Sequence, residues 1–135
     1  MATAVVSALL VASSRVEGMP VIPLLADLTA FNERLGLPTT ERAVWVTHAV
    51  IGAGLYGVAF ALLRPILPGR GLWEGVSFGL IAWLAMMVMF APLAGREIFF
   101  QDAAPAIAVV LLALHVLYGA LLGITAAALG GRSTA

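Results

Sequence analysis

The sequence predicts an all-α polytopic membrane protein, and its composition and its segment pattern carry that prediction. Apolar residues make up 62% of the chain and charged residues 10%, whereas about a quarter of the residues are charged in soluble domains. The mean hydropathy is +1.07. Apolar segments of membrane-spanning length alternate with short turns rich in Pro, Gly and Arg. We therefore expect residues 1–135 to form a single integral membrane domain.

Charge and cysteine content exclude several classes of function. The net charge is zero, so the sequence gives no reason to expect nucleic acid as a partner, and the lipid bilayer is the expected surrounding. The chain has no cysteine, which excludes disulfides, thiolate metal sites and cysteine nucleophiles. No catalytic constellation or phosphate-binding loop follows from the remaining residues. We therefore expect no enzyme activity.

The first two segments differ in character. Residues 2–14 are apolar, but at 1.5 Å per residue they span only about 20 Å of a core of about 30 Å. We expect a first membrane helix that ends near Glu17, and residues missing upstream of the start. In residues 20–38, leucine and phenylalanine recur at helical spacing while Asp27, Asn32, Glu33 and Arg34 fall elsewhere on the wheel. This pattern predicts an amphipathic interfacial helix in the first loop.

Three further membrane helices complete the prediction of four spans. The second covers residues 39–63, with Thr39, Thr40 and Glu41 supplying the N-terminal capping chemistry. The third covers residues 72–92. The fourth covers residues 102–129, with Asp102 as its cap. Arginines are nearly balanced between the two sides of the membrane, and the dense, short turn between the second and third helices, with Arg64 and Arg70, favours both termini in the cytoplasm.

One pattern occurs twice. Pro38 is followed after nine residues by His48 and then by Gly52, and Pro105 is followed after nine residues by His115 and then by Gly119. This duplication indicates a tandem helix-pair repeat. Ten residues of helix place each imidazole about 15 Å into the membrane, close to its midplane. Imidazoles at that depth are expected to face inward.

Each histidine has a glycine one turn later, which leaves a gap for a neighbouring helix or a planar ligand. Small residues at such spacing allow close interhelical packing. We expect these packing glycines to be Gly52, Gly54, Gly57, Gly119 and Gly123.

Three interpretations of the histidines are open. The favoured one is hydrogen bonding across the bundle, with a helix filling each gap. The second is axial ligation of haem b or a chlorophyll-type pigment by His48, His115 or both. The third is a path for protons or small solutes. We expect no metal site, because Met86, Met87 and Met89 fit packing better than copper ligation.

Several strings in the chain are familiar. Residues 45–57, Trp-Val-Thr-His-Ala-Val-Ile-Gly-Ala-Gly-Leu-Tyr-Gly, and residues 115–123, His-Val-Leu-Tyr-Gly-Ala-Leu-Leu-Gly, resemble small prokaryotic four-helix membrane proteins catalogued as a domain of unknown function. They are also loosely similar to YagU-type inner-membrane proteins. The resemblance implies a multi-pass protein of the prokaryotic plasma membrane and carries over no activity.

The function expected from the sequence is that of a non-catalytic accessory or structural subunit. Small size, glycine-rich helix faces and the lack of a catalytic motif favour other membrane protein subunits as partners. Binding of a haem or pigment through His48 and His115 is the alternative, and transport is the third.

Overall fold

The computed structural model describes residues 1–13, 17 and 22–130, and over these residues all regular structure is helical. The predicted all-α class is confirmed. The expected extension of the first helix towards Glu17 runs through residues 14–16, which lie outside the described residues.

Within the described part of the chain, three helices are long and apolar enough to cross a membrane. This agrees with the predicted multi-pass class, whereas the predicted count is four spans. They comprise Glu41–Ile66 and Pro105–Gly130, each of 26 residues, and Leu72–Leu93 of 22 residues. At 1.5 Å per residue they measure between about 33 and 39 Å, enough for a hydrocarbon core of about 30 Å.

Two of these helices contain π-helical segments. The first comprises α3 (Glu41–Ala49), π-helix η1 (Val50–Leu55), α4 (Tyr56–Leu63) and 3₁₀-helix η2 (Arg64–Ile66). The second comprises α5 (Leu72–Ala85), π-helix η3 (Met86–Phe90) and α6 (Ala91–Leu93). The third is α7 (Pro105–Gly130), preceded by 3₁₀-helix η4 (Ile98–Phe100). The predicted capping of the Glu41 helix is confirmed, because the Thr40 hydroxyl accepts from the Ala43 amide at 3.4 Å.

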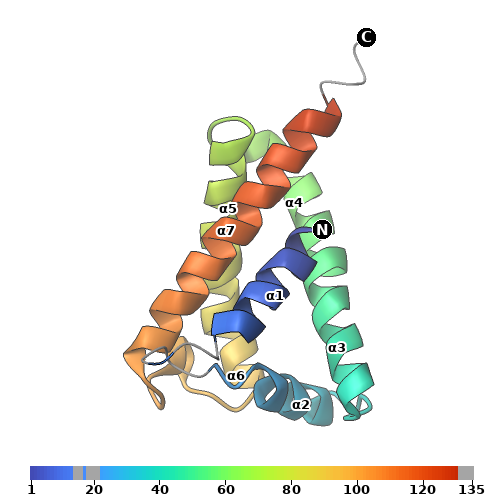
Figure 1. Ribbon diagram of the computed structural model, residues 1–135, viewed down its shortest axis with the longest axis vertical. Coiled ribbons are helices and arrows are strands. Elements are labelled where there is room, and N and C mark those ends of the chain that lie inside the picture. The colour runs from blue at the N-terminus through green and yellow to red at the C-terminus, as the bar shows by residue number, and fades with distance from the viewer. Residues whose placement is uncertain (14–16, 18–21, 131–135) are drawn as a thin grey trace.

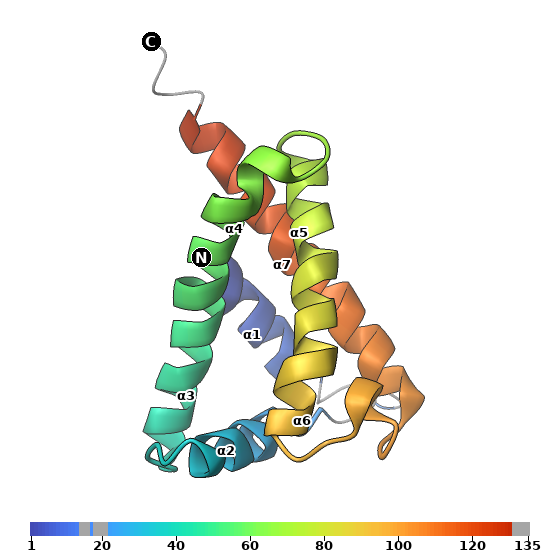
Figure 2. The ribbon, with the colours of Figure 1, turned by 180° about the vertical axis from the view of Figure 1, so that it is seen from behind.

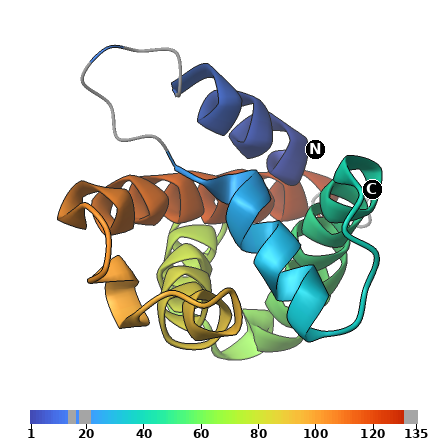
Figure 3. The ribbon, with the colours of Figure 1, turned by 90° about the horizontal axis from the view of Figure 1, so that it is seen from below.

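The remaining two helices are shorter. Helix α1 (Ala2–Ser13) has 12 residues and a length of about 18 Å, so it is shorter than a hydrocarbon core. It lies along α7 on the side away from α5 (Figures 1 and 3). Helix α2 (Leu24–Arg34) crosses the lower end of the bundle between the foot of α3 and α6 (Figure 1). Its polar residues Asp27 and Asn32 lie on the buried side.

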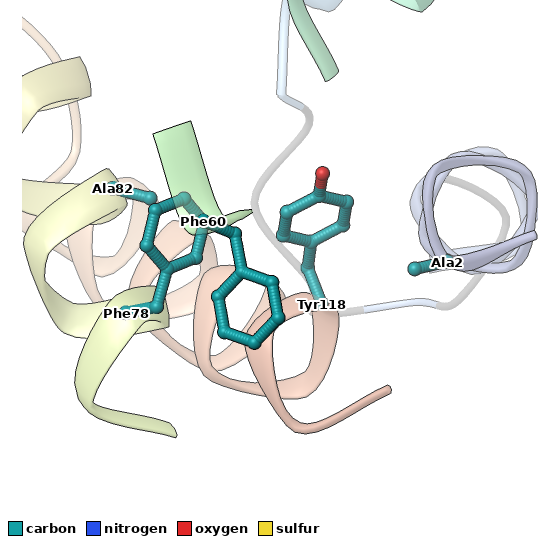
Figure 4. Packing of buried hydrophobic residues seen from close by; sticks show 5 residues of the cluster. All are labelled: Ala2, Phe60, Phe78, Ala82 and Tyr118. Carbon is teal, nitrogen blue, oxygen red and sulfur yellow. The ribbon is translucent and has the colours of Figure 1, made fainter. Parts of the chain in front are cut away.

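The core has two apolar clusters, one in the upper and one in the lower part of the bundle. Figure 4 shows the upper cluster, in which Tyr118 of α7 lies between the Phe60 ring of α4 and Ala2 of α1. The Phe60 and Phe78 rings meet edge to face at 5.2 Å. The lower cluster gathers around Met87 and Phe100, both essentially inaccessible. Together the clusters fix α5 and α7 as the centre of the fold.

The Glu41–Ile66 helix meets this centre only at its upper end. Its contacts with α5 are concentrated in α4, and α3 stands apart from α5 with α2 running between their lower ends (Figure 2). Within its most apolar stretch 6% of the residues are buried, compared with 28% in each of the other two spans. The bundle is therefore closed on the α5–α7 side and splayed on the α3 side.

Candidate functional site

Both histidines lie on the wall of one pocket, inside the splay between α3 and the rest of the bundle. His48 comes from α3 and His115 from α7, two helices that run in the same direction (Figure 1). The pocket has a volume of about 120 Å³ and a predominantly apolar lining. Helix α1 contributes Thr3 and Ser7, and α2 contributes Leu24 and Leu28. We call this the twin-histidine pocket.

The protonation of His115 follows from its hydrogen bond. Its Nδ1 lies 2.7 Å from the carbonyl oxygen of Leu111, one turn earlier on α7. A carbonyl can only accept, so Nδ1 carries the proton and donates. In the neutral ring Nε2 then holds a lone pair, and it has no hydrogen-bond partner among the described residues. His115 therefore offers the pocket an acceptor nitrogen.

His48 is held by a short chain of hydrogen bonds to α1. The Ser7 hydroxyl donates to the Thr3 carbonyl at 2.7 Å, which uses its single proton. Ser7 Oγ then accepts from His48 Nε2, 2.9 Å away. The remaining nitrogen, His48 Nδ1, is an acceptor without a partner in the described part of the chain. In each imidazole, therefore, the N–H has an acceptor, and the lone pair of the other nitrogen has no partner among the described residues.

The two tyrosines of the pocket direct their hydroxyl protons to backbone carbonyls. Tyr118 donates to the carbonyl of Gly52, which ties α7 to η1. Tyr56 donates to the carbonyl of Ala82 at 3.3 Å. The Tyr56 ring also lies edge-on to the His115 imidazole, with 6.4 Å between ring centroids. The tyrosines therefore tie neighbouring helices together, and both belong to the pocket lining.

Both π-helices border the pocket. Ile51 and Gly52 of η1 and Met86 and Phe90 of η3 belong to its lining. π-helical turns are rare in proteins and occur frequently at functional sites. The presence of two π-helices at one pocket therefore makes this pocket the candidate functional site.

The glycines after the two histidines are placed differently. Gly119 and Gly123 of α7 lie directly against Gly75 and Gly79 of α5, and a Cβ on any of the four would meet the backbone of the other helix. Gly75 and Gly79 were missed in the sequence analysis. They form a second Gly-x-x-x-Gly, Gly75-Val-Ser-Phe-Gly79, which the printed sequence displays and which could have identified this face.

On the other histidine helix, one predicted glycine meets another element. A Cβ on Gly52 would lie 2.7 Å from the Thr3 methyl carbon, so α1 occupies that gap. Around Gly57 nothing lies within 4 Å of such a Cβ, and near Gly54 the one atom found belongs to Val50 of the same helix. These two glycines are therefore open to whatever surrounds the described chain.

A charged cluster holds α2 to the loop between α6 and α7. Arg96 Nε donates to Asp27 at 2.8 Å, and its Nη1 donates to Asp102 at 3.2 Å. Burial raises the pKa of the Asp27 carboxyl and outweighs the opposing bond from Arg96. Partial desolvation also acts on Asp102, but the Glu97 amide and Arg96 hold the pKa of that carboxyl below its usual range. Arg96 thus joins the loop to α2, Asp102 holds Arg96 and the Glu97 amide within the loop, and α7 begins at Pro105.

Among the described residues no group of three or more His, Cys, Asp or Glu side chains is arranged to hold a metal ion. The three methionines that were considered as copper ligands lie in different environments. Met86 lines the pocket, Met87 is buried in the lower cluster, and Met89 is 65% exposed. They do not converge on one point.

These features define a class: a helical membrane protein in which two histidines from separate helices meet at one internal pocket. The chain belongs to the family of unknown function DUF6789, whose model matches residues 1–135. The resemblance to a domain of unknown function is thereby confirmed. No curated protein and no solved structure matches the chain, so the likeness to YagU-type proteins stays a resemblance of the strings quoted above.

Proposed function

We propose that this protein binds a small, mainly apolar ligand with polar groups inside the membrane, in the twin-histidine pocket, and catalyses no reaction. The observation that carries the proposal is the convergence of His48 and His115 on one apolar pocket, each with a free lone pair. Ligand sites combine an apolar lining with a few placed polar groups, and intramembrane polar side chains mark functional sites. The two π-helices on the pocket wall support the same conclusion.

The expected haem or chlorophyll-type ligand fits this pocket in chemistry but not in size. A ligating histidine commonly donates its other ring N–H to a backbone carbonyl, as His115 does to Leu111. The pocket measures about 120 Å³, whereas sites for drug-sized ligands occupy about 300–1,000 Å³. A tetrapyrrole would require α3 to move outwards. An absorption spectrum of natively purified protein decides this point: a Soret or chlorin band that is lost in both His48→Ala and His115→Ala would replace the small ligand by a tetrapyrrole.

The pocket itself is tested by filling it. Leu114 lines the pocket, whereas Leu117 on the same helix faces outwards with 37% of its surface exposed. Leu114→Trp should reduce by at least tenfold the amount of small molecule that mass spectrometry recovers from natively purified protein. Leu117→Trp is the matched control and should leave that amount unchanged. Equal recovery from both variants, with wild-type thermal stability, would remove the pocket as the binding site.

An accessory role in a larger membrane assembly is the second candidate, and we propose another membrane subunit as the partner. The observation in its favour is the Glu41–Ile66 helix, whose most apolar stretch is 6% buried within the chain. Its outer face exposes Val50, Val58 and Leu62, and Gly54 on the same helix is open. Small residues on a helix face permit close helix–helix approach in membranes. A photo-crosslinker at Val58 should capture protein, and the same group at Val109 on α7 is the control; adducts with lipid alone at both positions would contradict the role.

Placement in the membrane completes the proposal. We place the protein in the prokaryotic plasma membrane with α1 as a fourth, short span, α2 along the interface, and both termini in the cytoplasm. Arg64 and Arg70 in the short turn after α4 support this orientation. Because the chain has no cysteine, single cysteines report topology directly. Arg70→Cys should react with a membrane-impermeant maleimide only after the cytoplasmic side is opened, and Ala103→Cys in intact cells; the reverse pattern would invert the orientation.

A further inference from the structure

We propose that the ligand of the twin-histidine pocket is a membrane quinol, meaning a single aromatic ring that carries two hydroxyl groups and an apolar tail. The inference rests on the proposed function and names its ligand class. Three properties of the pocket lead to it: the polarity of its hydrogen-bonding groups, its volume and its surroundings.

The pocket presents acceptors and few donors. His115 has used its Nδ1 proton on Leu111, and His48 has used its Nε2 proton on Ser7. Ser7, Tyr56 and Tyr118 have directed their hydroxyl protons to backbone carbonyls. Thr3 adds one hydroxyl, which interacts with the Tyr118 hydroxyl. A ligand that satisfies both imidazoles must therefore bring two donors.

The charges around the pocket favour neutral over cationic hydrogen-bond donors on the ligand. Among the described residues no Asp or Glu belongs to the pocket lining, so a cationic ligand such as an amine would be buried there without a counter-charge. A buried, unpaired charge is far more costly than a buried hydroxyl that finds an acceptor. Two neutral hydroxyl groups match two imidazole lone pairs without that cost.

Size and lining favour one ring. An apolar cavity of about 150 Å³ is known to accept benzene, and this pocket holds about 120 Å³ with an open side. Tyr56 and Phe90 supply aromatic surface against which a flat ring can pack. A rigid ring with hydroxyls at opposite positions carries one donor at each end, and we place one of them against His48 on α3 and the other against His115 on α7. An apolar tail would leave through the open side into the lipid.

The same polarity discriminates between redox forms. A quinone offers two carbonyl oxygens, which are acceptors and would face the lone pairs of His48 and His115. A quinol offers two donors. Each net hydrogen bond is worth about a three- to tenfold change in affinity. The pocket is therefore expected to prefer the reduced form by at least tenfold.

The test varies the ligand and leaves the protein intact. Full-length protein in lipid nanodiscs is titrated calorimetrically with a short-chain alkyl-1,4-hydroquinone, its monomethyl ether, its dimethyl ether and the matching 1,4-quinone. We expect affinity to fall about three- to tenfold with each hydroxyl that is methylated, and the quinone to bind like the dimethyl ether. A dimethyl ether or quinone that binds as tightly as the hydroquinone would overturn the inference.

Two sets of variants separate this inference from the proposed function. In His48→Leu and His115→Leu the step between the hydroquinone and its monomethyl ether should disappear, while binding of the dimethyl ether reports that the pocket still folds. In Leu114→Trp all four compounds should bind at least tenfold more weakly than in Leu117→Trp. Equal binding by these two tryptophan variants would overturn the pocket as a ligand site, whereas equal binding of all four compounds to the wild type would overturn the quinol alone.

Discussion

The two sides of this bundle use glycine in opposite ways. On the α5–α7 side, Gly75, Gly79, Gly119 and Gly123 bring two backbones into direct contact. On the α3–α4 side, a Cβ on Gly57 would meet nothing within 4 Å. Small residues remove side-chain bulk in both places, but a second helix occupies the space in only one of them.

The difference explains why a pocket exists. The α5–α7 pair is held together by its own backbone complementarity, so it needs no help from α3. The Glu41–Ile66 helix is instead attached at separate points, which include the Tyr118 hydroxyl on Gly52 of η1, the His48–Ser7 hydrogen bond to α1, and α2 at the foot of α3. Between these attachments the helices diverge around His48 and His115. The α5–α7 pair packs closely and α3 is held only at separate points, so an internal space remains between them. Uniform close packing of all the helices would fill that space.

The largest expected effect comes from adding a methyl group to the tight side. In Gly75→Ala the new Cβ would meet the Gly119 carbonyl and lie 2.9 Å from the Gly123 Cα, so the two backbones must separate. We expect the free energy of unfolding in detergent to fall by about 1–3 kcal/mol. Gly57→Ala is the matched control and should be neutral or stabilising by up to about 1 kcal/mol. Similar losses in both variants would mean that the two sides do not differ.

A smaller effect should follow from cutting the upper attachment of α3. Tyr118→Phe removes the hydroxyl that donates to the Gly52 carbonyl and keeps the ring in its cluster. The expected loss is about 1 kcal/mol of unfolding free energy. Spin labels on α3 and α7 should also show a broader distance distribution than in the wild type. An unchanged distribution would show that this bond does not hold α3 in place.

The smallest expected effect is the pH dependence of the free energy of unfolding that comes from Asp27 on α2, the helix at the foot of α3. The folded state raises the pKa of Asp27 above its ordinary value of 3.8, because burial outweighs the bond from Arg96. The folded protein then holds this proton more tightly than the unfolded chain, so the stability from Asp27 is full below pH 3.8 and falls as pH rises through the folded pKa.

Asp27→Asn removes this dependence and leaves Asp102, whose pKa shifts in the opposite direction, in both proteins. The stability of the wild type relative to the variant should therefore decrease as the pH rises above 3.8. Chemical denaturation at several pH values measures it. A difference that grows with pH would reverse the sign and place the Asp27 pKa below 3.8 in the folded state.

Much of the fold was predictable because apolar length and turn chemistry act locally. The all-α class, the Thr40 cap and the end of α4 at Arg64-Pro65 follow from neighbouring residues. Asp102 was expected to cap the last helix. It instead accepts from the Glu97 amide and pairs with Arg96, because a charged partner from the loop competes with the helix end for the carboxylate.

The site was predictable in its residues and not in its arrangement. The repeated Pro–His–Gly pattern singled out His48 and His115 and predicted that they would face inward. No local signal indicated that α1 would anchor His48 through Ser7, or that the π-helices would open beside it. These depend on which helices become neighbours, and non-local contacts leave no periodicity in the sequence.

The π-helix η1 gives the pocket a dependence on chain register. His48 and Tyr56 lie eight residues apart, which in an unbroken α-helix would turn them about 80° away from each other. The wider turn of Val50–Leu55 reduces this angle, and both side chains reach the same pocket. Deleting one codon within this segment would leave a helix of nearly the same length and hydropathy. With a separation of seven residues in a regular α-helix, His48 and this tyrosine would lie about 20° apart, so the π-helix accommodates one additional residue between two side chains that share a face.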